Sequence, residues 1–237
     1  MKNNTLADDR ILIFMHIPKT GGMTLKRIIK RQYPEDKILK DITDGKISEF
    51  KKIVSENEIR FVFGHLSFGL HMHISQPCTY VTMIREPIDR VISMYYYVLG
   101  KKDHPLHGIV KDLLFEEFID HPDLKVHTSN MQTKRALGKN TLSPSDLEQA
   151  MQNLEDHFSV IGITEMFDDS VELMKQKFNW NDVSYVRKNK TKNKLRKEEI
   201  DPNIINKVIA NNELDIQLYK WAKNRLIQQL KSSNAIE

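Results

Sequence analysis

Four short apolar runs divide the chain at irregular intervals: ILIFMH at 11–16, RFVFGH at 60–65, TYVTMI at 79–84 and FSVIGI at 158–163. None of them alternates strictly between apolar and polar residues, and all are rich in β-branched or aromatic side chains. That pattern is typical of strands whose two faces are both covered. We therefore predict four buried, parallel strands.

Segments with helical spacing lie between and after these runs. We expect helices over 24–33, over 87–99 with Pro87 at the first position, over 168–178, and over a long stretch from 204 to 230. A further helix leads into the fourth strand, with Ser143 or Ser145 as its N-cap and Glu148 in its first turn. Strands that alternate with helices predict an α/β fold, a three-layer sandwich with a central parallel sheet flanked by helices.

Length and composition narrow the class of protein. The chain has 237 residues, of which 40% are apolar and 29% charged, so we expect one globular domain over 1–237. No apolar stretch approaches the roughly 20 residues of a membrane span, and the first ten residues are too polar for a signal peptide. The single cysteine, Cys78, fits a reducing compartment and is interpreted as a small core residue. We expect a cytoplasmic protein.

The positive charge is concentrated in one segment. The stretch 187–197, RKNKTKNKLRK, holds seven basic residues and no acidic one, in a chain of formal net charge +4. A compact basic segment suits a small polyanion better than a long nucleic acid, and a solvated loop is the alternative.

The first predicted strand ends in an unusual loop, PKTGG at 18–22. In parallel sheets, ligands bind at the carboxyl ends of the strands. Gly21 and Gly22 would let the backbone approach a ligand, and the helix that starts near Met23 would direct its unpaired N–H groups at the loop. Lys19 adds a positive charge and Thr24 a hydroxyl. The pattern indicates a phosphate site; an ordinary glycine-rich turn with a surface lysine is the alternative.

The loop does not meet the nucleotide triphosphatase pattern G-x-x-x-x-G-K-[ST], because Lys19 precedes the glycines. The third predicted strand also ends in Arg85, where a magnesium-binding acid would be expected. These departures disfavour a metal-dependent nucleotide triphosphatase.

A second anion site is indicated after the third predicted strand, in REPIDRVISMYYY at 85–97. Arg85 lies just before the helix opened by Pro87, and Ser93 lies about two turns into it, so both could contact one anion. A local ion pair is the alternative for Arg85. Arg90 would either assist at this site or pair with Glu86 or Asp89.

HIPKTGGMTL at 16–25 followed by REPIDRVISMYYY resembles the sulfotransferases that use 3′-phosphoadenosine 5′-phosphosulfate (PAPS), in particular the carbohydrate branch typified by heparan sulfate 2-O- and 6-O-sulfotransferases. Further likenesses are SNMQTKRALG at 129–138, FSVIGITEMFDDSVELM at 158–174 and NNELDIQLYKWA at 211–222. The resemblance implies a P-loop-like sandwich. This sequence departs from the family at Met23, where serine or threonine is more common, and it lacks the family's membrane anchor, as expected for a bacterial-type cytosolic enzyme.

The resemblance also implies roles for individual residues. The 5′-phosphosulfate would be held by the loop, and the 3′-phosphate by Arg85 and Ser93. The loop residues are Lys19, Thr20, Gly21, Gly22, Met23 and Thr24. A late basic loop closes the nucleotide site in the family, which implies nucleotide contacts for Arg187, Lys194 and Arg196.

Sulfuryl transfer needs a base for the hydroxyl proton of the acceptor and a cation near the departing phosphate oxygen. Lys19 suits the second task. His65, in GHLSF at the end of the second predicted strand, suits the first, since the resembling enzymes have a catalytic histidine in a matching segment. A structural histidine is the alternative. A zinc site of His65, His71 and His73 is disfavoured, and we expect His71 and His73 to line the acceptor cleft.

The sequence thus predicts transfer of a sulfuryl group from PAPS to a hydroxyl of an acceptor, a glycan or glycolipid, with adenosine 3′,5′-bisphosphate (PAP) as the product. We expect no metal and no nucleic-acid partner. An ATP-dependent kinase-like enzyme and a non-enzymatic polyanion-binding module are the alternatives. The acceptor pocket would be built from 66–76, 100–128 and the basic segment.

Overall fold

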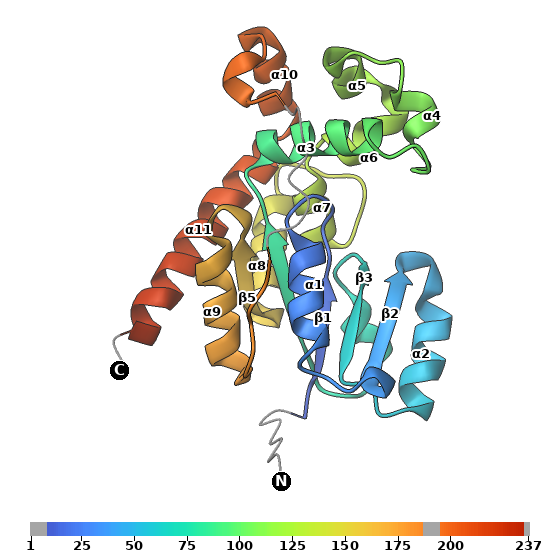
Figure 1. The fold of residues 1–237 in the computed structure, drawn as a ribbon, viewed down its shortest axis with the longest axis vertical. Helices are drawn as coiled ribbons and strands as arrows, with labels where there is room; N and C mark the ends of the chain where they lie inside the picture. Colours follow the sequence, from blue (N-terminus) through green and yellow to red (C-terminus); the bar gives the residue numbers. More distant parts are fainter. Residues whose placement is uncertain (1–8, 187–194, 235–237) are drawn as a thin grey trace.

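A parallel sheet of five strands forms the centre of the protein (Figure 1). The structure is a computed structural model and describes residues 9–186 and 195–234. The strands are β1 (Ile11–Met15), β2 (Ile38–Thr43), β3 (Phe61–His65), β4 (Cys78–Ile84) and β5 (Phe158–Ile163). Their order is β2-β3-β1-β4-β5, and every neighbouring pair is parallel. This confirms the predicted α/β sandwich and the four predicted strands.

The sequence analysis missed one strand, β2. It lies at the edge of the sheet, and only Ile38 and Ile42 of its six residues are buried. Its pairing with β3 shifts register between Leu39 and Ile42, where Asp41 has a φ of 55°. A short, half-exposed and irregular edge strand lacks the continuous apolar run that identifies a buried strand.

Helices cover both faces of the sheet, with α1 and α9 on one face and α8 on the other (Figure 1). The longer helices are α1 (Gly22–Lys30), α2 (Ile47–Glu56), α3 (Pro87–Leu99), α7 (Met131–Leu137), α8 (Asp146–His157), α9 (Phe167–Phe178), α10 (Pro202–Asn211) and α11 (Glu213–Asn234). Pro87 opens α3 as predicted, and Ser145 is the N-cap of α8, although its side chain makes no capping bond. Helix α2 was not predicted.

The predicted helix over 204–230 is in fact two helices that break at Asn212. The buried Asn212 side chain donates to the carbonyl oxygens of Thr128 (2.7 Å) and Val208 (2.9 Å). Helix α10 belongs to a second hydrophobic cluster with α3, whereas Leu218 and Leu226 of α11 pack into the main core against the sheet. The break lets one continuous apolar pattern serve two cores.

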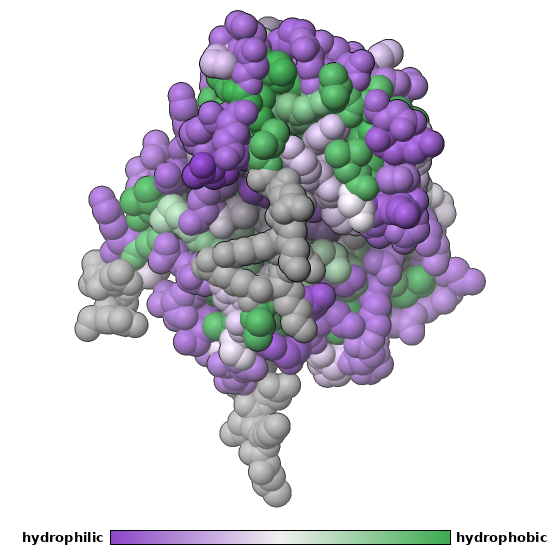
Figure 2. All heavy atoms as spheres, turned by 45° about the horizontal axis from the view of Figure 1, so that its top comes forward, coloured by the Kyte–Doolittle hydropathy of each residue, from purple (hydrophilic) through white to green (hydrophobic). Residues whose placement is uncertain are grey.

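The second cluster forms a layer beyond the carboxyl ends of the strands. Besides α3 and α10, the short helices α4 (His107–Val110) and α5 (Phe115–Asp120) contribute to it, and α6 (Lys125–Thr128) lies in the same layer (Figure 1). Apolar side chains also gather at the surface over this layer (Figure 2). Leu114, which precedes α5, is 71% exposed. The layer lies over the carboxyl edge of the sheet, where the loops after β1, β3 and β4 meet. Within the described part of the chain, no helix is long and apolar enough to cross a membrane.

Candidate active site

The loop after β1 leads directly into α1, as the sequence predicts. Lys19 and Gly21 both have left-handed backbone conformations, with φ of 70° and 81°, and Gly21 is the N-cap of α1. The carbonyl oxygen of Gly21 accepts from the N–H of Thr24 at 3.0 Å. The loop therefore curls around the start of a helix whose first N–H groups and dipole attract anions.

Thr20 contributes to this loop through its backbone. Its fully buried hydroxyl donates to the carbonyl oxygen of Ile17 (2.8 Å), and its own carbonyl oxygen accepts from the hydroxyl of Thr164 (2.8 Å), just after β5. The hydroxyl thus stabilises the turn from inside. Met23, by contrast, is 47% exposed and Thr24 is half-buried, so both reach the surface of the loop.

Gly22 is required for a reason that the sequence analysis did not give. A Cβ atom on Gly22 would lie 2.1 Å from Cδ2 and 2.3 Å from Nε2 of His16, far inside contact distance. The missing side chain therefore makes room for the ring of His16, rather than for a ligand. Gly21 is needed for its positive φ.

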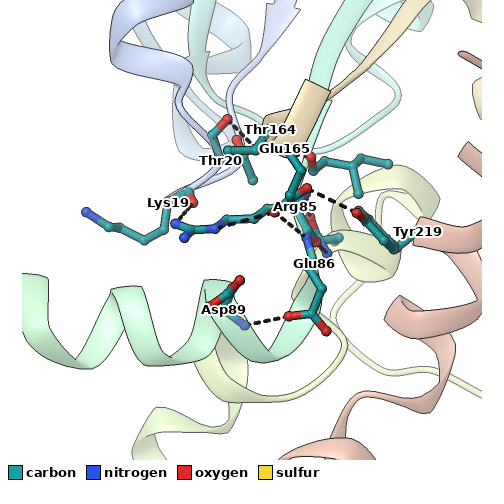
Figure 3. Close-up of polar contacts among 10 residues, drawn as sticks. Lys19, Thr20, Arg85, Glu86, Asp89, Thr164, Glu165 and Tyr219 are labelled. Carbon is teal, nitrogen blue, oxygen red and sulfur yellow. Dashed lines mark hydrogen bonds and ion pairs between the residues drawn. The ribbon is translucent and has the colours of Figure 1, made fainter. Parts of the chain in front are cut away.

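Lys19 extends from the loop toward α3. Its Nζ lies 3.7 Å from the centroid of the Tyr97 ring, and its carbonyl oxygen accepts from Nη1 of Arg85 at 3.1 Å (Figure 3). A cation over an aromatic face is stabilised by the ring quadrupole. The predicted phosphate loop and the predicted second anion site are therefore in direct contact.

Arg85 is held in place by hydrogen bonds from a side chain of α7 to its backbone. Gln132 of α7 accepts from the N–H of Arg85 and donates to its carbonyl oxygen, both at 2.9 Å. The guanidinium lies between the carbonyl of Lys19 and the carboxylate of Glu165, whose Oε1 is 3.9 Å from Nε (Figure 3). Arg85 thus pairs with an acid that is distant in sequence, rather than with a local one as considered above, and it also faces the predicted phosphate loop.

Gln132 is itself positioned by the buried Asp215 of α11. The Asp215 carboxylate accepts from the N–H of Gln132 (3.1 Å) and from both the N–H (2.7 Å) and the hydroxyl (2.8 Å) of Thr133. These residues lie in two of the segments that resemble the sulfotransferases, 129–138 and 211–222. The sequence analysis gave them no role; their contacts link both segments to Arg85.

Two further residues of α3, Ser93 and Arg90, are buried in the protein. Ser93 is only 6% exposed. Arg90 is completely buried, donates to the carbonyl oxygen of His127 at 2.9 Å and contacts the sulfur of Met131 at 3.3 Å. The carboxylate of Glu86, one of the partners considered for Arg90, accepts from the N–H of Asp89 (2.7 Å) and so caps the helix.

His65 is the last residue of β3 and is partly exposed. Its Nδ1 is 3.2 Å from the carbonyl oxygen of His16. Because a carbonyl oxygen can only accept, this contact places the proton on Nδ1 and leaves the lone pair on Nε2. Partial burial lowers the pKa of His65, partly offset by the hydrogen bond to His16, so the ring is neutral at pH 7. A neutral imidazole with an available Nε2 can accept a proton.

Two cations near His65 were missed by the sequence analysis. Nζ of Lys26 lies 3.8 Å from the centroid of the Phe63 ring and 3.7 Å from the carboxylate of Asp41, and burial lowers its pKa. Arg135 of α7 is the second, and its charge contributes to the lowered pKa of His65. Nothing in the local sequence separates either residue from ordinary surface cations of a helix.

Arg135 belongs to a polar network on the segment after His65. Its Nη1 donates to the carboxylate of Asp44 and to the hydroxyl of Ser67, both at 2.9 Å. Asp44 also accepts from the N–H and the hydroxyl of Ser67, both at 2.8 Å. The network fixes the chain two residues beyond the histidine.

The expectation that His71 lines a cleft with His65 is wrong. The N–H of His71 donates to the hydroxyl of Tyr80 at 2.8 Å, and its ring lies 4.4 Å from that of His157. Tyr80 and His157 lie toward the amino ends of β4 and β5, away from the phosphate loop. Sequence proximity was misleading because the chain after His65 turns back along the sheet.

His73 also lies elsewhere, in a hollow of about 510 Å³ beside Lys51 and Lys52 of α2. Among the residues that the structure describes, no group of three or more His, Cys, Asp or Glu side chains is arranged to hold a metal ion.

The basic segment is only partly described. Arg187 and Lys194 lie outside the described residues. Arg196 is described: its side chain is 77% exposed, and its Nη2 lies 3.4 Å from the carboxylate of Glu199. The nucleotide contact expected of Arg196 therefore stays a prediction.

Residues 2–222 match the model of a family described as the sulfotransferase family. No curated protein matches the sequence.

Two solved structures resemble the fold at low sequence identity. A sulfotransferase from Alicyclobacillus acidocaldarius is 15% identical, with 94% of this chain and 96% of that one covered and a TM-score of 0.50. Mouse sulfotransferase SULT7A1 complexed with PAP is 14% identical, with 86% of this chain covered and a TM-score of 0.46. This chain spans 63% of the length of the mouse protein.

Proposed function

We propose that this chain, which belongs to the sulfotransferase family, transfers a sulfuryl group from PAPS to a hydroxyl group of an acceptor and releases PAP. The observation that carries the proposal is the convergence of three strand ends. Three groups lie at the carboxyl edge of the sheet: the predicted phosphate loop after β1, Arg85 after β4 and the neutral His65 at the end of β3. The 3.1 Å contact between Arg85 and the carbonyl of Lys19 joins the first two.

The described residues fit a donor with two separate anionic groups. The curled loop and the first turn of α1 suit the 5′-phosphosulfate, because backbone N–H groups there carry partial positive charge. The guanidinium of Arg85, held by Gln132, suits the 3′-phosphate, with Ser93 on the following helix. Bound PAPS supplies an activated sulfuryl group with PAP as the leaving group.

His65 and Lys19 carry the proposed proton and charge steps. Nε2 of His65 accepts the proton of the acceptor hydroxyl as its oxygen attacks sulfur. The ammonium of Lys19 stabilises the negative charge that develops on the departing phosphate oxygen. Lys19 lies over Tyr97 in this structure, so the same side chain exchanges one favourable contact for a stronger, charge-assisted one when the donor is present.

A glycan or glycolipid is the proposed acceptor class. The resemblance to the carbohydrate branch supports it, as does the polar surround of His65. Charged and hydroxyl groups lie on the strand ends and helices next to the histidine. They belong to Lys26, Asp41, Asp44, Ser67 and Arg135. Such groups suit an acceptor that carries many hydroxyls.

Calorimetry in the absence of magnesium tests the nucleotide site first. We expect PAP to bind with a large preference over AMP and ATP, because only PAP presents both anions. Equal binding of AMP would contradict the 3′-phosphate role of Arg85. Preference for ATP that requires magnesium would favour the kinase-like alternative.

Transfer itself is then measured with radiolabelled PAPS and a panel of glycans and glycolipids. We expect label to move to at least one acceptor, and Lys19→Ala to slow the transfer strongly. Binding of heparin or DNA that is unchanged in Lys19→Ala and His65→Ala, with no transfer by the wild type, would favour a polyanion-binding module.

A further inference from the structure

His16 is a buried histidine with no role in the function proposed above. It follows β1 directly, is only 8% exposed and lies beneath the partly exposed His65. The two rings are stacked, with centroids 4.6 Å apart and planes at 27°. The ring of His16 also lies against that of Phe14, with centroids 5.5 Å apart and planes at 29°. The buried ring of His16 thus packs against the ring of His65 and supports it.

The backbone of His16 also contacts His65. Its carbonyl oxygen is the acceptor, at 3.2 Å, for Nδ1 of His65. A histidine side chain in water favours the tautomer with the proton on Nε2, which would leave no lone pair there. The contact with His16 therefore selects the tautomer that a base acting through Nε2 requires.

The opposite edge of His16 supports the phosphate loop. A Cβ on Gly22 would overlap Cδ2 and Nε2 of its ring, at 2.1 and 2.3 Å, so the ring fills the space beneath the first turn of α1. The same side chain is in contact with the helix start that would hold the 5′-phosphosulfate and with His65. Because packed interiors leave few voids, a shift of the start of α1 would displace His65 through His16, and a shift of His65 would displace the start of α1.

His16 remains neutral across the working range of pH. Burial is the largest of the causes that lower the pKa of His16 to about 3, followed by the neighbouring His65, Lys26 and Lys19 in that order. Because the ring of His16 is neutral, His65 can accept a proton. A charged His16 would repel the imidazolium that His65 then becomes. Burial also keeps His16 from serving as the base itself, since an acceptor hydroxyl has no access to its ring.

We propose that His16 is a positioning residue, which holds His65 in the Nδ1-protonated tautomer and in register with the phosphate loop. The inference deepens the proposed function and rests on it for its catalytic meaning. Its structural content, the orientation and tautomer of His65, can be measured on the protein without any substrate.

Nitrogen-15 NMR of the imidazole rings tests this content, with His65→Gln used to assign the signals of His65. In the wild type we expect His65 as the Nδ1-protonated tautomer with a pKa below its ordinary value. In His16→Phe, which keeps a neutral stacked ring, both properties should persist. In His16→Ala the ring of His65 loses its support, so we expect the Nε2-protonated tautomer to dominate and the pKa to rise toward 6.5.

Phe14→Leu is the matched control, because it alters the apolar packing of His16 at a ring other than that of His65. We expect it to leave the tautomer of His65 unchanged. If His16→Ala fails to fold, His16→Leu, which retains apolar volume without an aromatic ring, replaces it with the same expectation. An unaltered tautomer and pKa of His65 in a folded His16→Ala or His16→Leu would overturn the proposal.

The kinetic readout separates positioning from general destabilisation. We expect His16→Ala to lower kcat by about tenfold or more while the affinity for PAP changes by only a few fold, and His16→Phe to restore most of kcat. Equal losses of kcat in the alanine and phenylalanine variants would contradict a role of the stacked ring. If the wild type shows no transfer, the proposed function fails, and the NMR result still decides whether His16 positions His65.

Discussion

Gln132→Leu tests whether the tertiary structure beyond the sulfotransferase motifs prepares the 3′-phosphate site. Gln132 is completely buried, and its side chain makes two 2.9 Å hydrogen bonds to the backbone of Arg85. Leucine has a similar volume and no polar atoms. The substitution therefore removes both bonds and leaves the N–H and carbonyl of Arg85 without these partners.

The expected loss of stability follows from those two groups. A net hydrogen bond contributes about 1 kcal/mol, and a buried polar group deprived of its partner costs about 1–3 kcal/mol. Because Arg85 lies at the end of β4 and is partly accessible to water, we expect the free energy of unfolding to fall by about 2–4 kcal/mol.

The expected loss of binding has a different origin. Fixing the backbone of one residue costs roughly 1–2 kcal/mol of conformational entropy. In the wild type the backbone of Arg85 is already ordered on folding. In Gln132→Leu it becomes ordered only when the 3′-phosphate binds, so the entropy cost is subtracted from the free energy of binding. Since about 1.4 kcal/mol corresponds to a tenfold change in Kd, the affinity for PAP should fall by about 5- to 30-fold. The affinity for AMP, which lacks the 3′-phosphate, should stay within about twofold of the wild type.

Urea unfolding and calorimetric titration with PAP and AMP measure these effects. Asn153→Leu is the matched control, because the amide of Asn153 donates to the carbonyl oxygen of Ala136, at 3.1 Å, near the other end of α7. It removes a side-chain bond to the same helix without touching Arg85. Unchanged preference for PAP over AMP in a folded Gln132→Leu variant would refute the reasoning that Gln132 prepares the arginine.

Further predictions concern the proposed catalytic groups and the buried histidine. His65→Ala should abolish transfer from PAPS and leave the Kd for PAP within a few fold; near-normal turnover would exclude His65 as the base. Lys19→Ala should lower kcat more than it weakens PAP, because it loses an interaction specific to the transition state, and equal losses would make Lys19 a binding residue only. Arg85→Glu should weaken PAP far more than AMP in competition binding, and an unaltered ratio would remove the 3′-phosphate assignment. Because the pKa of His16 falls from 6.5 to about 3 on folding, the unfolded state binds the proton more tightly, and stability is lost as pH falls below 6.5. Between pH 7.5 and 5.0 this group should cost about 2 kcal/mol in urea unfolding, and His16→Phe should remove that part of the pH dependence; an identical dependence in both proteins would contradict it.

The parts of the fold that were predicted correctly, including the backbone around the candidate site, depend on short sequence separations. Strand β1, the loop at 18–22 and the start of α1 are consecutive, so a proline, two glycines and a helical period suffice to indicate them. Strand β2 was missed because its burial is one-sided and irregular, which no local pattern records. His71 was misplaced because nearness in sequence to His65 was taken for nearness in space.

The amino-acid sequence by itself determined the α/β class, the order of most elements and the residues that the phosphate loop presents, because backbone conformation and helix starts are set by neighbouring residues. Only the tertiary structure decided which of these residues meet. Gln132 reaches Arg85 from 47 positions away, and Nδ1 of His65 meets the carbonyl of His16 from 49 positions away. Gly22 owes its identity to a ring that lies beneath it. Contacts of this kind depend on strand order and on the packing of the layers, and these are properties of the whole chain.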